Sequence, residues 1–305
     1  MKEQKWWRFL VPVVLVVNVV VIWFVIGSAK PEETSVVVEP KIEFRSPPMP
    51  DSVAFAGEWL PLDRFDVKES LDRELLSNAY FHSQTIRYIK LAPRYFSIIE
   101  PILKEKGIPD DFKYLAIAES GLDPRAVSPA HAVGFWQFMK GTAMQYGLEV
   151  NNEVDERYHV EKATYAACDY LKDSYEKYGN WTMVAASYNA GMRGVDRQIE
   201  RQKTDSYYNL LLVEETARYL YRIVALKLIL EHPEKYNFII PESEKYPIIQ
   251  TKDVEITGSV EDFADFALRR GINYKLLKDF NPWLRQSYLK NPSHKKYIIE
   301  IPMLN

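Results

Sequence analysis

Leu115-Ala116-Ile117-Ala118-Glu119-Ser120-Gly121 places one carboxyl group at the end of an apolar run. Upstream, Gly107-Ile108-Pro109 ends one helix and starts the next, because proline suits a first-turn position. Gly121 suits a C-terminal cap. The pattern therefore predicts a helix whose last turn carries Glu119. Apolar neighbours and the negative end of the helix dipole both disfavour the carboxylate and raise the pKa of Glu119, as a general acid near neutral pH requires.

Two further polar motifs follow in the chain, Gly134-Phe135-Trp136-Gln137 and Ser187-Tyr188-Asn189-Ala190-Gly191. Apolar residues recur at helical spacing from Val67 onward, which predicts a helical domain around these motifs. Glycine and proline residues set the expected ends of the helices. The helices expected after Glu119 are 135–146, 161–178, 181–190 and 214–231.

The ordered motifs resemble those of the goose-lysozyme-like lytic transglycosylases of bacterial cell walls, over roughly residues 80–231. They are most similar to the membrane-bound murein transglycosylases whose C-terminal part carries lysin-motif repeats. The resemblance implies that the Glu119-Ser120 pair supplies the catalytic acid. It also implies that Gln137, Tyr188 and Asn189 line the glycan groove.

Glu215-Thr216-Ala217-Arg218-Tyr219 is similar to the Glu-Thr-x-x-Tyr segment of the same family, in which the tyrosine reaches the catalytic glutamate. This likeness implies that Tyr219 orients or protonates Glu119. The alternative is an amphipathic helix whose tyrosine only packs in the core. The sequence leaves both interpretations open.

Most glycosidases use two carboxyl groups, but this domain offers one well-placed candidate. One suffices for the peptidoglycan substrate that the resemblance implies, because the C6 hydroxyl of N-acetylmuramic acid can attack C1 of the same sugar. Glu119 would protonate the leaving oxygen and then act as base toward that hydroxyl. We expect cleavage of the β-1,4 bond to N-acetylglucosamine without water, leaving 1,6-anhydro ends. The alternatives are a hydrolytic muramidase and an inactive peptidoglycan-binding protein.

The polar residues of the motifs have expected roles around this reaction. Ser120 can hydrogen-bond the Glu119 carboxyl or a substrate oxygen, and Gln137 offers a donor and an acceptor to an N-acetyl group. Tyr188 can stack on a sugar face. Asn189 can steady the acetamido group or the developing charge. Trp136 is expected to be a core aromatic.

Composition limits the other possibilities. The chain has 305 residues, 47% of them hydrophobic and 27% charged, with a net charge of −3. This predicts a packed globular protein and excludes a strongly basic nucleic-acid-binding surface. Its five histidines show no metal-ligand spacing and its glycines form no phosphate-binding run, so we expect neither a metal nor another cofactor. The expected partners are peptidoglycan glycan strands; the sequence does not predict protein partners.

The N-terminus predicts membrane attachment. A Val-rich stretch from Phe9 to Gly27 approaches the ~20 residues that span a bilayer, and basic residues precede it. We therefore expect an anchor that leaves the catalytic domain in the periplasm, within the cell envelope; cleavage near Ser28-Ala29 is the alternative. The single cysteine, Cys168, is expected to be buried core.

These patterns predict a mainly α protein with a lysozyme-like catalytic domain and a small C-terminal module. The C-terminal pattern of strand, two helices and strand resembles a lysin motif, with strands at 254–257 and 297–301 and helices at 260–269 and 274–280. Thr257-Gly258-Ser259-Val260 replaces the usual Gly-Asp-Thr opening, which leaves sugar binding by this module open. The expected divisions are 1–29 anchor or signal, 30–66 Pro-rich linker, 67–240 catalytic domain and 241–305 lysin-motif-like module.

Overall fold

The computed structural model describes residues 12, 16–20, 22–23 and 45–303. The chain divides into two units, Met1–Arg45 and Ser46–Asn305. In the first unit the described residues up to 23 are helical and exposed, and most of the predicted anchor and of residues 30–45 lies outside the described residues. Within the described residues, no helix combines the length and hydropathy needed to cross a membrane.

The second unit begins with a short hairpin, in which β1 (Ala54–Phe55) pairs antiparallel with β2 (Glu58–Trp59). The Phe55 side chain is buried against Phe112, with ring centroids 5.1 Å apart. The carboxylate of Glu58 accepts hydrogen bonds from the first two backbone amides of a later helix. The predicted linker is therefore wrong from residue 46 onward. This segment packs on the helical domain, because the few apolar residues that lie between its prolines are buried in the core.

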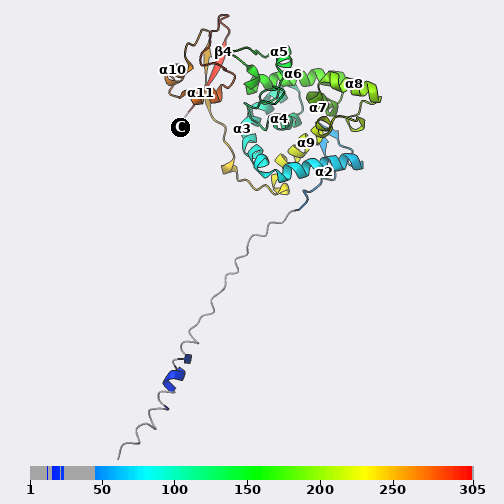
Figure 1. Ribbon diagram of the computed structural model, residues 1–305, viewed down its shortest axis with the longest axis vertical. Helices are drawn as coiled ribbons and strands as arrows, with labels where there is room; N and C mark the ends of the chain where they lie inside the picture. The colour runs from blue at the N-terminus through cyan, green and yellow to red at the C-terminus, as the bar shows by residue number, and fades with distance from the viewer. Residues whose placement is uncertain (1–11, 13–15, 21, 24–44, 304–305) are drawn as a thin grey trace, which may run out of the picture. The chain divides into compact units, whose positions relative to one another are not determined.

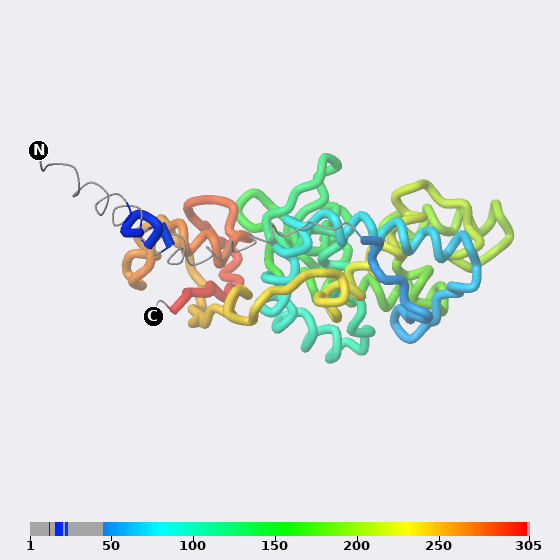
Figure 2. Tube along the Cα trace, turned by 90° about the horizontal axis from the view of Figure 1, so that it is seen from below, coloured from blue at the N-terminus to red at the C-terminus, as the bar shows by residue number. Residues whose placement is uncertain are grey.

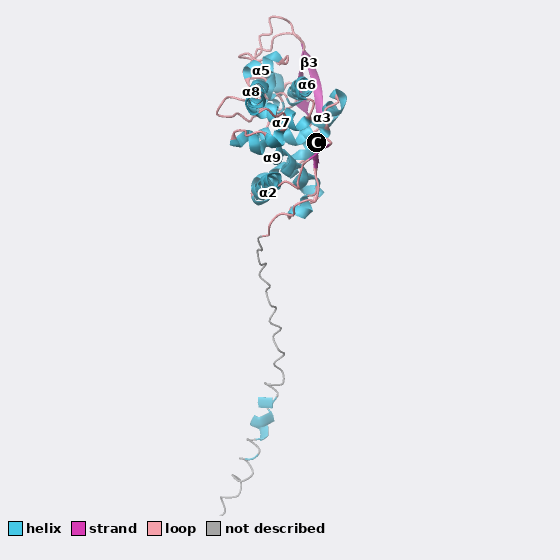
Figure 3. Cartoon of the chain, turned by 90° about the vertical axis from the view of Figure 1, so that its right-hand side faces the viewer, coloured by secondary structure: helices cyan, strands magenta, loops and turns pink. Residues whose placement is uncertain are grey.

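Helices form most of the second unit, as the cyan ribbons in Figure 3 show, and this confirms the mainly α prediction. Three of them match the predicted helices closely, whereas the helix after Gly191 was not predicted. The α-helices before the C-terminal module are α2 (Phe65–Tyr80), α3 (His82–Lys106), α4 (Lys113–Ser120), α5 (Lys140–Gln145), α6 (Val160–Tyr178), α7 (Trp181–Ala190), α8 (Met192–Gln202) and α9 (Glu214–Glu231). Short 3-10 helices join them at Asp110–Phe112, Glu156–Tyr158, Tyr207–Asn209, Pro233–Tyr236 and Glu242–Glu244.

Helix α9 organises the core, because it packs against α2, α4 and α7. Most of its residues from Thr216 to Ile229 are buried, as expected for a helix surrounded by others. Helix α4 lies near the middle of the group, beside α3 and α9 (Figure 1). The predicted burial of Cys168 on α6 is confirmed. The packing brings the polar ends of α4, α7 and α9 into one region.

The C-terminal module has the predicted strand-helix-helix-strand order. Strand β3 (Thr251–Ile256) pairs antiparallel with β4 (Tyr297–Pro302), and α10 (Phe263–Leu268) and α11 (Tyr274–Phe280) lie between them in the chain. The apolar residues of the two helices and of β4 form a second, smaller core, which also includes Val133, Val154 and Tyr158 of the preceding domain. In Figure 2 the module is the orange and red segment, which lies beside the green loop around residue 150.

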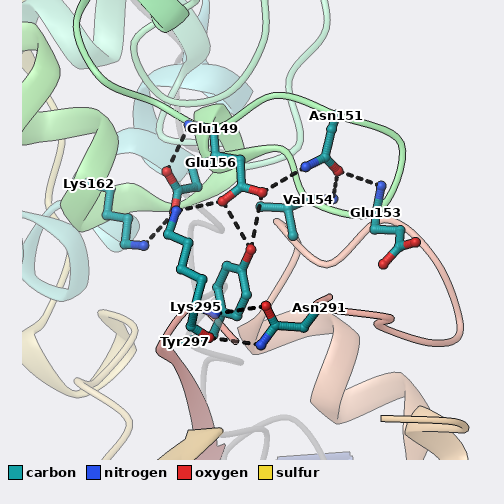
Figure 4. A network of polar contacts seen from close by, with 9 residues as sticks. All are labelled: Glu149, Asn151, Glu153, Val154, Glu156, Lys162, Asn291, Lys295 and Tyr297. Atoms are coloured by element: carbon teal, nitrogen blue, oxygen red, sulfur yellow. Dashed lines mark hydrogen bonds and ion pairs between the residues drawn. The ribbon is translucent and has the colours of Figure 1, made fainter. Parts of the chain in front are cut away.

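The loop from Glu149 to His159 joins the module to the helical domain. Glu149 accepts hydrogen bonds from Lys295 Nζ (2.5 Å) and from the Tyr297 hydroxyl (3.0 and 3.1 Å). Glu156, which is buried, pairs with Lys162 and lies 3.6 Å from Lys295 Nζ. Figure 4 shows these side chains converging from the loop and from the C-terminal strand. The ion pairs of Lys295 with Glu149 and Glu156 thus connect the C-terminal module to the helical domain.

Asn281 stabilises the C-terminal module from its interior. The fully buried side chain donates to the carbonyls of Leu277 (2.9 Å) and Glu300 (2.7 Å) and accepts from the Glu300 amide (2.9 Å). Asn281→Ala leaves the carbonyl and the amide of Glu300 without these partners, at about 1–3 kcal/mol each. We expect the free energy of unfolding, measured with urea, to fall by at least about 2 kcal/mol. The matched variant Asn152→Ala, at an exposed position, should change it little; equal effects would contradict this role.

Candidate active site

Glu119 lies in the last turn of α4, as predicted. Gly121 ends the helix in the left-handed conformation (φ 60°, ψ 30°), and its amide donates to the Ile117 carbonyl at 2.8 Å. Leu115 and Ile117 on the same helix are buried in the core, whereas the Glu119 side chain is half-buried. The carboxyl group is therefore held between the apolar interior and the surface.

Tyr219 donates a short hydrogen bond from its hydroxyl to Oε1 of Glu119. Tyr219 is on α9, and its side chain, which is only 2% exposed, packs in the hydrophobic core of the helical domain. The sequence left open whether Tyr219 packs in the core or reaches Glu119. In the structure it does both. The bond fixes the orientation of the Glu119 side chain.

Burial raises the pKa of Glu119 to about 7, and it is the largest influence on that carboxyl. The hydrogen bond from Tyr219 lowers the pKa, because it stabilises the charged form. The nearby negative charge of Glu215 raises it, and the positive charge of Arg222 lowers it. The balance leaves a carboxyl group that can both give and take a proton near neutral pH.

Tyr188 and Asn189 occupy the last turn of α7, and the charge of Glu119 acts on Tyr188. The Tyr188 hydroxyl donates to the Trp136 carbonyl at 2.8 Å, which ties α7 to the second motif. Asn189 Oδ1 accepts from the Thr216 hydroxyl at 2.7 Å, which ties α7 to the start of α9. Both residues are partly exposed.

The predicted helix 135–146 is wrong in its first half. Residues 134–137 form a tight turn instead, and Val133 and Phe138 pair across it. Gly134 and Gln137 both have positive φ, 78° and 48°, which a helix does not allow. The turn buries Trp136, whose indole nitrogen donates to the Thr164 hydroxyl at 2.9 Å. Burial of this ring outweighs the helical pattern; the helix itself begins only at Lys140.

Ser120 and Gln137 use their donors within the protein. The Ser120 hydroxyl donates to the Ala116 carbonyl of its own helix at 3.0 Å, rather than to Glu119. Gln137 Nε2 donates to the carbonyls of Ala126 (3.2 Å) and Gly134 (2.8 Å). Gln137 therefore stabilises its own loop, and its Oε1 atom accepts no hydrogen bond from the residues that the structure describes.

Arg157 was not predicted, yet it holds the second motif in place. It forms a two-point contact with Asp155 (2.9 and 2.7 Å) and donates to the carbonyls of Phe138 (3.1 Å) and His131 (3.3 Å). A Cβ atom added to Gly134 would lie 2.0 Å from the Arg157 carbonyl oxygen, so glycine is required there. Asp-x-Arg in a loop is too common a pattern to reveal this role.

Comparison with known families agrees with this geometry. Residues 96–211 match the family described as "Transglycosylase SLT domain". This part of the chain is therefore similar to a transglycosylase SLT domain. Residues 252–305 match the "Soluble lytic transglycosylase C-terminal LysM-like domain". Glu119, the second motif and the Tyr188-Asn189 pair all lie within the SLT match, whereas Tyr219 lies after it.

The SLT domain has named relatives. The chain is 28% identical over 247 residues to membrane-bound lytic murein transglycosylase D of Escherichia coli K12, covering 78% of this chain and 53% of the relative. The same protein of E. coli O6:H1 gives the same values. The chain thus spans about half the length of the curated relatives that it matches.

Two solved structures are also similar to the chain. One is the 70 kDa soluble lytic transglycosylase of E. coli, with 22% identity and a TM-score of 0.40 over 50% of this chain and 26% of that one. The other is an inactive mutant of the lytic transglycosylase Slt from Pseudomonas aeruginosa, with 18% identity and a TM-score of 0.38 over 52% and 28%.

The described residues offer no group of three or more His, Cys, Asp or Glu side chains suited to hold a metal ion.

Gly134→Ala tests the close approach in the second motif. The added methyl group would overlap the Arg157 carbonyl and strain a backbone with φ of 78°, so we expect a lower melting temperature and displacement of the turn. Gly141→Ala is the matched control, because its added Cβ meets nothing within 4 Å and its backbone is helical. Equal melting temperatures for the two variants would contradict the proposed constraint.

The raised pKa of Glu119 predicts a pH-dependent effect on stability. Between its ordinary value of 4.5 and about 7, the unfolded chain releases the proton while the folded protein keeps it, which penalises the folded state as pH rises. Glu119→Gln removes this penalty. We expect the variant to gain stability over the wild type from pH 4.5 to 7 and to keep the gain at higher pH, in thermal melts. Glu69→Gln at an exposed position is the control; a gain that is independent of pH would contradict the assignment.

Proposed function

We propose that this protein is a lytic transglycosylase that cleaves the β-1,4 bond between N-acetylmuramic acid and N-acetylglucosamine in peptidoglycan. The reaction uses no water and leaves 1,6-anhydro-N-acetylmuramic acid ends. The observation that carries the proposal is the environment of Glu119. This carboxyl is half-buried, its pKa is raised to about 7, and it accepts a hydrogen bond from Tyr219. Glu119 also lies within the residues that match the SLT family.

In the first step the protonated Glu119 donates its proton to the glycosidic oxygen, and the bond from C1 to that oxygen breaks. Glu119 becomes a carboxylate as positive charge develops on the sugar. The Tyr219 hydroxyl stabilises this carboxylate, because a hydrogen bond to the charged form favours it. In the second step the C6 hydroxyl forms the new bond to C1 and returns its proton to Glu119. One carboxyl group serves both half-reactions.

The neighbouring polar groups are proposed to bind the glycan. Tyr188, on which the charge of Glu119 acts, and Asn189, which is bonded to Thr216, are proposed to contact the sugar whose bond breaks. Gln137 is proposed to use Oε1 as an acceptor for an N-acetyl N–H, because its Nε2 is engaged in the loop. Ser120, whose hydroxyl donates within α4, is proposed to offer its oxygen as an acceptor to the substrate.

The proposal also places the protein in the cell envelope. An N-terminal anchor at residues 1–29 and a linker at residues 30–45 would hold the catalytic domain, which includes the packed segment 46–66, and the LysM-like module, 241–305, on the periplasmic side. The name of the E. coli relative, which describes it as membrane-bound, supports this arrangement.

Glu119→Gln tests the proposed function directly. Gln keeps the shape and can still accept the Tyr219 hydrogen bond, but it cannot donate a proton as an acid. We expect release of anhydro-muropeptides from purified sacculi to fall by about 10²–10⁴-fold, measured by mass spectrometry, while binding to sacculi persists. Glu69→Gln should keep wild-type activity.

The products separate the rival functions. Muropeptides that end in a reducible N-acetylmuramic acid would indicate a hydrolytic muramidase instead. Near wild-type digestion by Glu119→Gln would overturn the assignment of the acid. Sacculus binding without any digestion by the wild-type protein would indicate an inactive binding protein.

A further inference from the structure

Glu74 is a buried carboxylate that pairs with α9, the helix that carries Tyr219. It is on α2, with only 1% of its side chain exposed, and it faces two arginines of α9. Arg218 Nε lies 2.5 Å from its Oε1 atom, and Arg222 Nε lies 3.7 Å from its Oε2 atom. A charge buried this deeply is costly unless it is paired, so its position relative to these arginines is well defined.

Arg222 interacts with two carboxyl groups, those of Glu74 and Glu119. It follows Tyr219 by three residues on α9, so the two side chains leave the same side of the helix. Tyr219 reaches Glu119, and the positive charge of Arg222 is near enough to lower the pKa of Glu119 as well. In the part of the chain that the structure describes, the ion pair of Arg222 is nevertheless with Glu74 and not with Glu119.

We propose that Glu74 is a positioning residue for the acid: it holds the Arg222 guanidinium toward α2, so that Arg222 does not pair with Glu119. A guanidinium placed directly on Glu119 would favour its charged form and remove the proton that the reaction needs. This inference rests on the proposed function, because it concerns the protonation of the same carboxyl group.

Other groups near Glu119 come from three helices. The charged or titratable ones are Glu215, Tyr219 and Arg222 on α9, Tyr188 on α7, and Arg87 and Tyr88 on α3. Arg87 donates to the Gly121 carbonyl at 3.2 Å and is thereby held on the end of α4. Among the described residues, Arg222 is the cation that lowers the pKa of Glu119. Its placement therefore decides how much positive charge the acid experiences.

The pH dependence of activity tests this inference. The alkaline limb of kcat/KM reports the pKa of the acid in the free enzyme. Arg222→Gln removes the nearby cation, so the limb should move to higher pH by about half a unit or more. Glu74→Gln releases Arg222, so the limb should move to lower pH. The rates would be measured as muropeptide release from sacculi by the full chain between about pH 5 and 9.

Arg218→Gln is the matched control. Arg218 also pairs with Glu74, but its charge is not among those that shift the pKa of Glu119. We expect its limb to stay at the wild-type pH. The double variant Glu74→Gln/Arg222→Gln should lose the acid shift of the single Glu74→Gln variant. If Glu74→Gln does not fold, Arg222→Gln still decides, because Arg222 is 31% exposed.

An unshifted limb in Arg222→Gln would overturn the inference, as would a Glu74→Gln variant whose activity falls equally at every pH. The latter result would mean that Glu74 only stabilises the fold. Neither result affects the proposed function, which is tested separately by the products of the wild-type protein and by the activity of Glu119→Gln. The two proposals can therefore fail separately.

Discussion

The hydrogen bond between Tyr219 and Glu119 connects the two helices on which the site depends. Helix α9 is buried along most of its length, so the position of Tyr219 is fixed by packing rather than by the surface. Helix α4 ends immediately after Glu119 at a left-handed glycine, so the carboxyl group cannot move far along its own helix. The bond therefore joins two rigid parts, and it fixes the acid without burying it completely. A fully buried carboxyl would be protonated but inaccessible, whereas an exposed one would be charged at neutral pH.

The second motif depends on a different set of contacts, which reach the C-terminal module. Arg157 holds the turn around Gly134 through backbone carbonyls, and Asp155 orients Arg157. The Asp155 amide in turn donates to the Trp283 carbonyl of the module at 2.9 Å. The module is thus continuous with the loop that supports the motif. Its polar residues at this boundary, Lys295 and Tyr297, are engaged with Glu149.

The sequence predicted the features that depend on local signals. Apolar spacing and glycine caps predicted α4, α6, α7 and α9 and the strand-helix-helix-strand order of the module, because these elements are set by their own residues. It failed where distant residues decide the conformation. The turn at 134–137 looks helical in sequence, but burial of Trp136 against Thr164 requires a backbone with positive φ. The hairpin around Phe55 lies among prolines, and distant residues such as Phe112 make it part of the core.

The same distinction applies to the site. Glu119 was predictable, because its apolar run and its helix end lie next to it in the chain. Its charged surroundings were not, since Glu74 precedes it by 45 residues and Arg222 follows it by 103. These two residues meet only because α2 and α9 pack side by side. Single motifs can therefore nominate an acid, but the charge that the acid experiences depends on ion pairs made by the tertiary fold. We therefore infer that a glutamate on α2 influences the protonation of the proposed acid through one shared arginine.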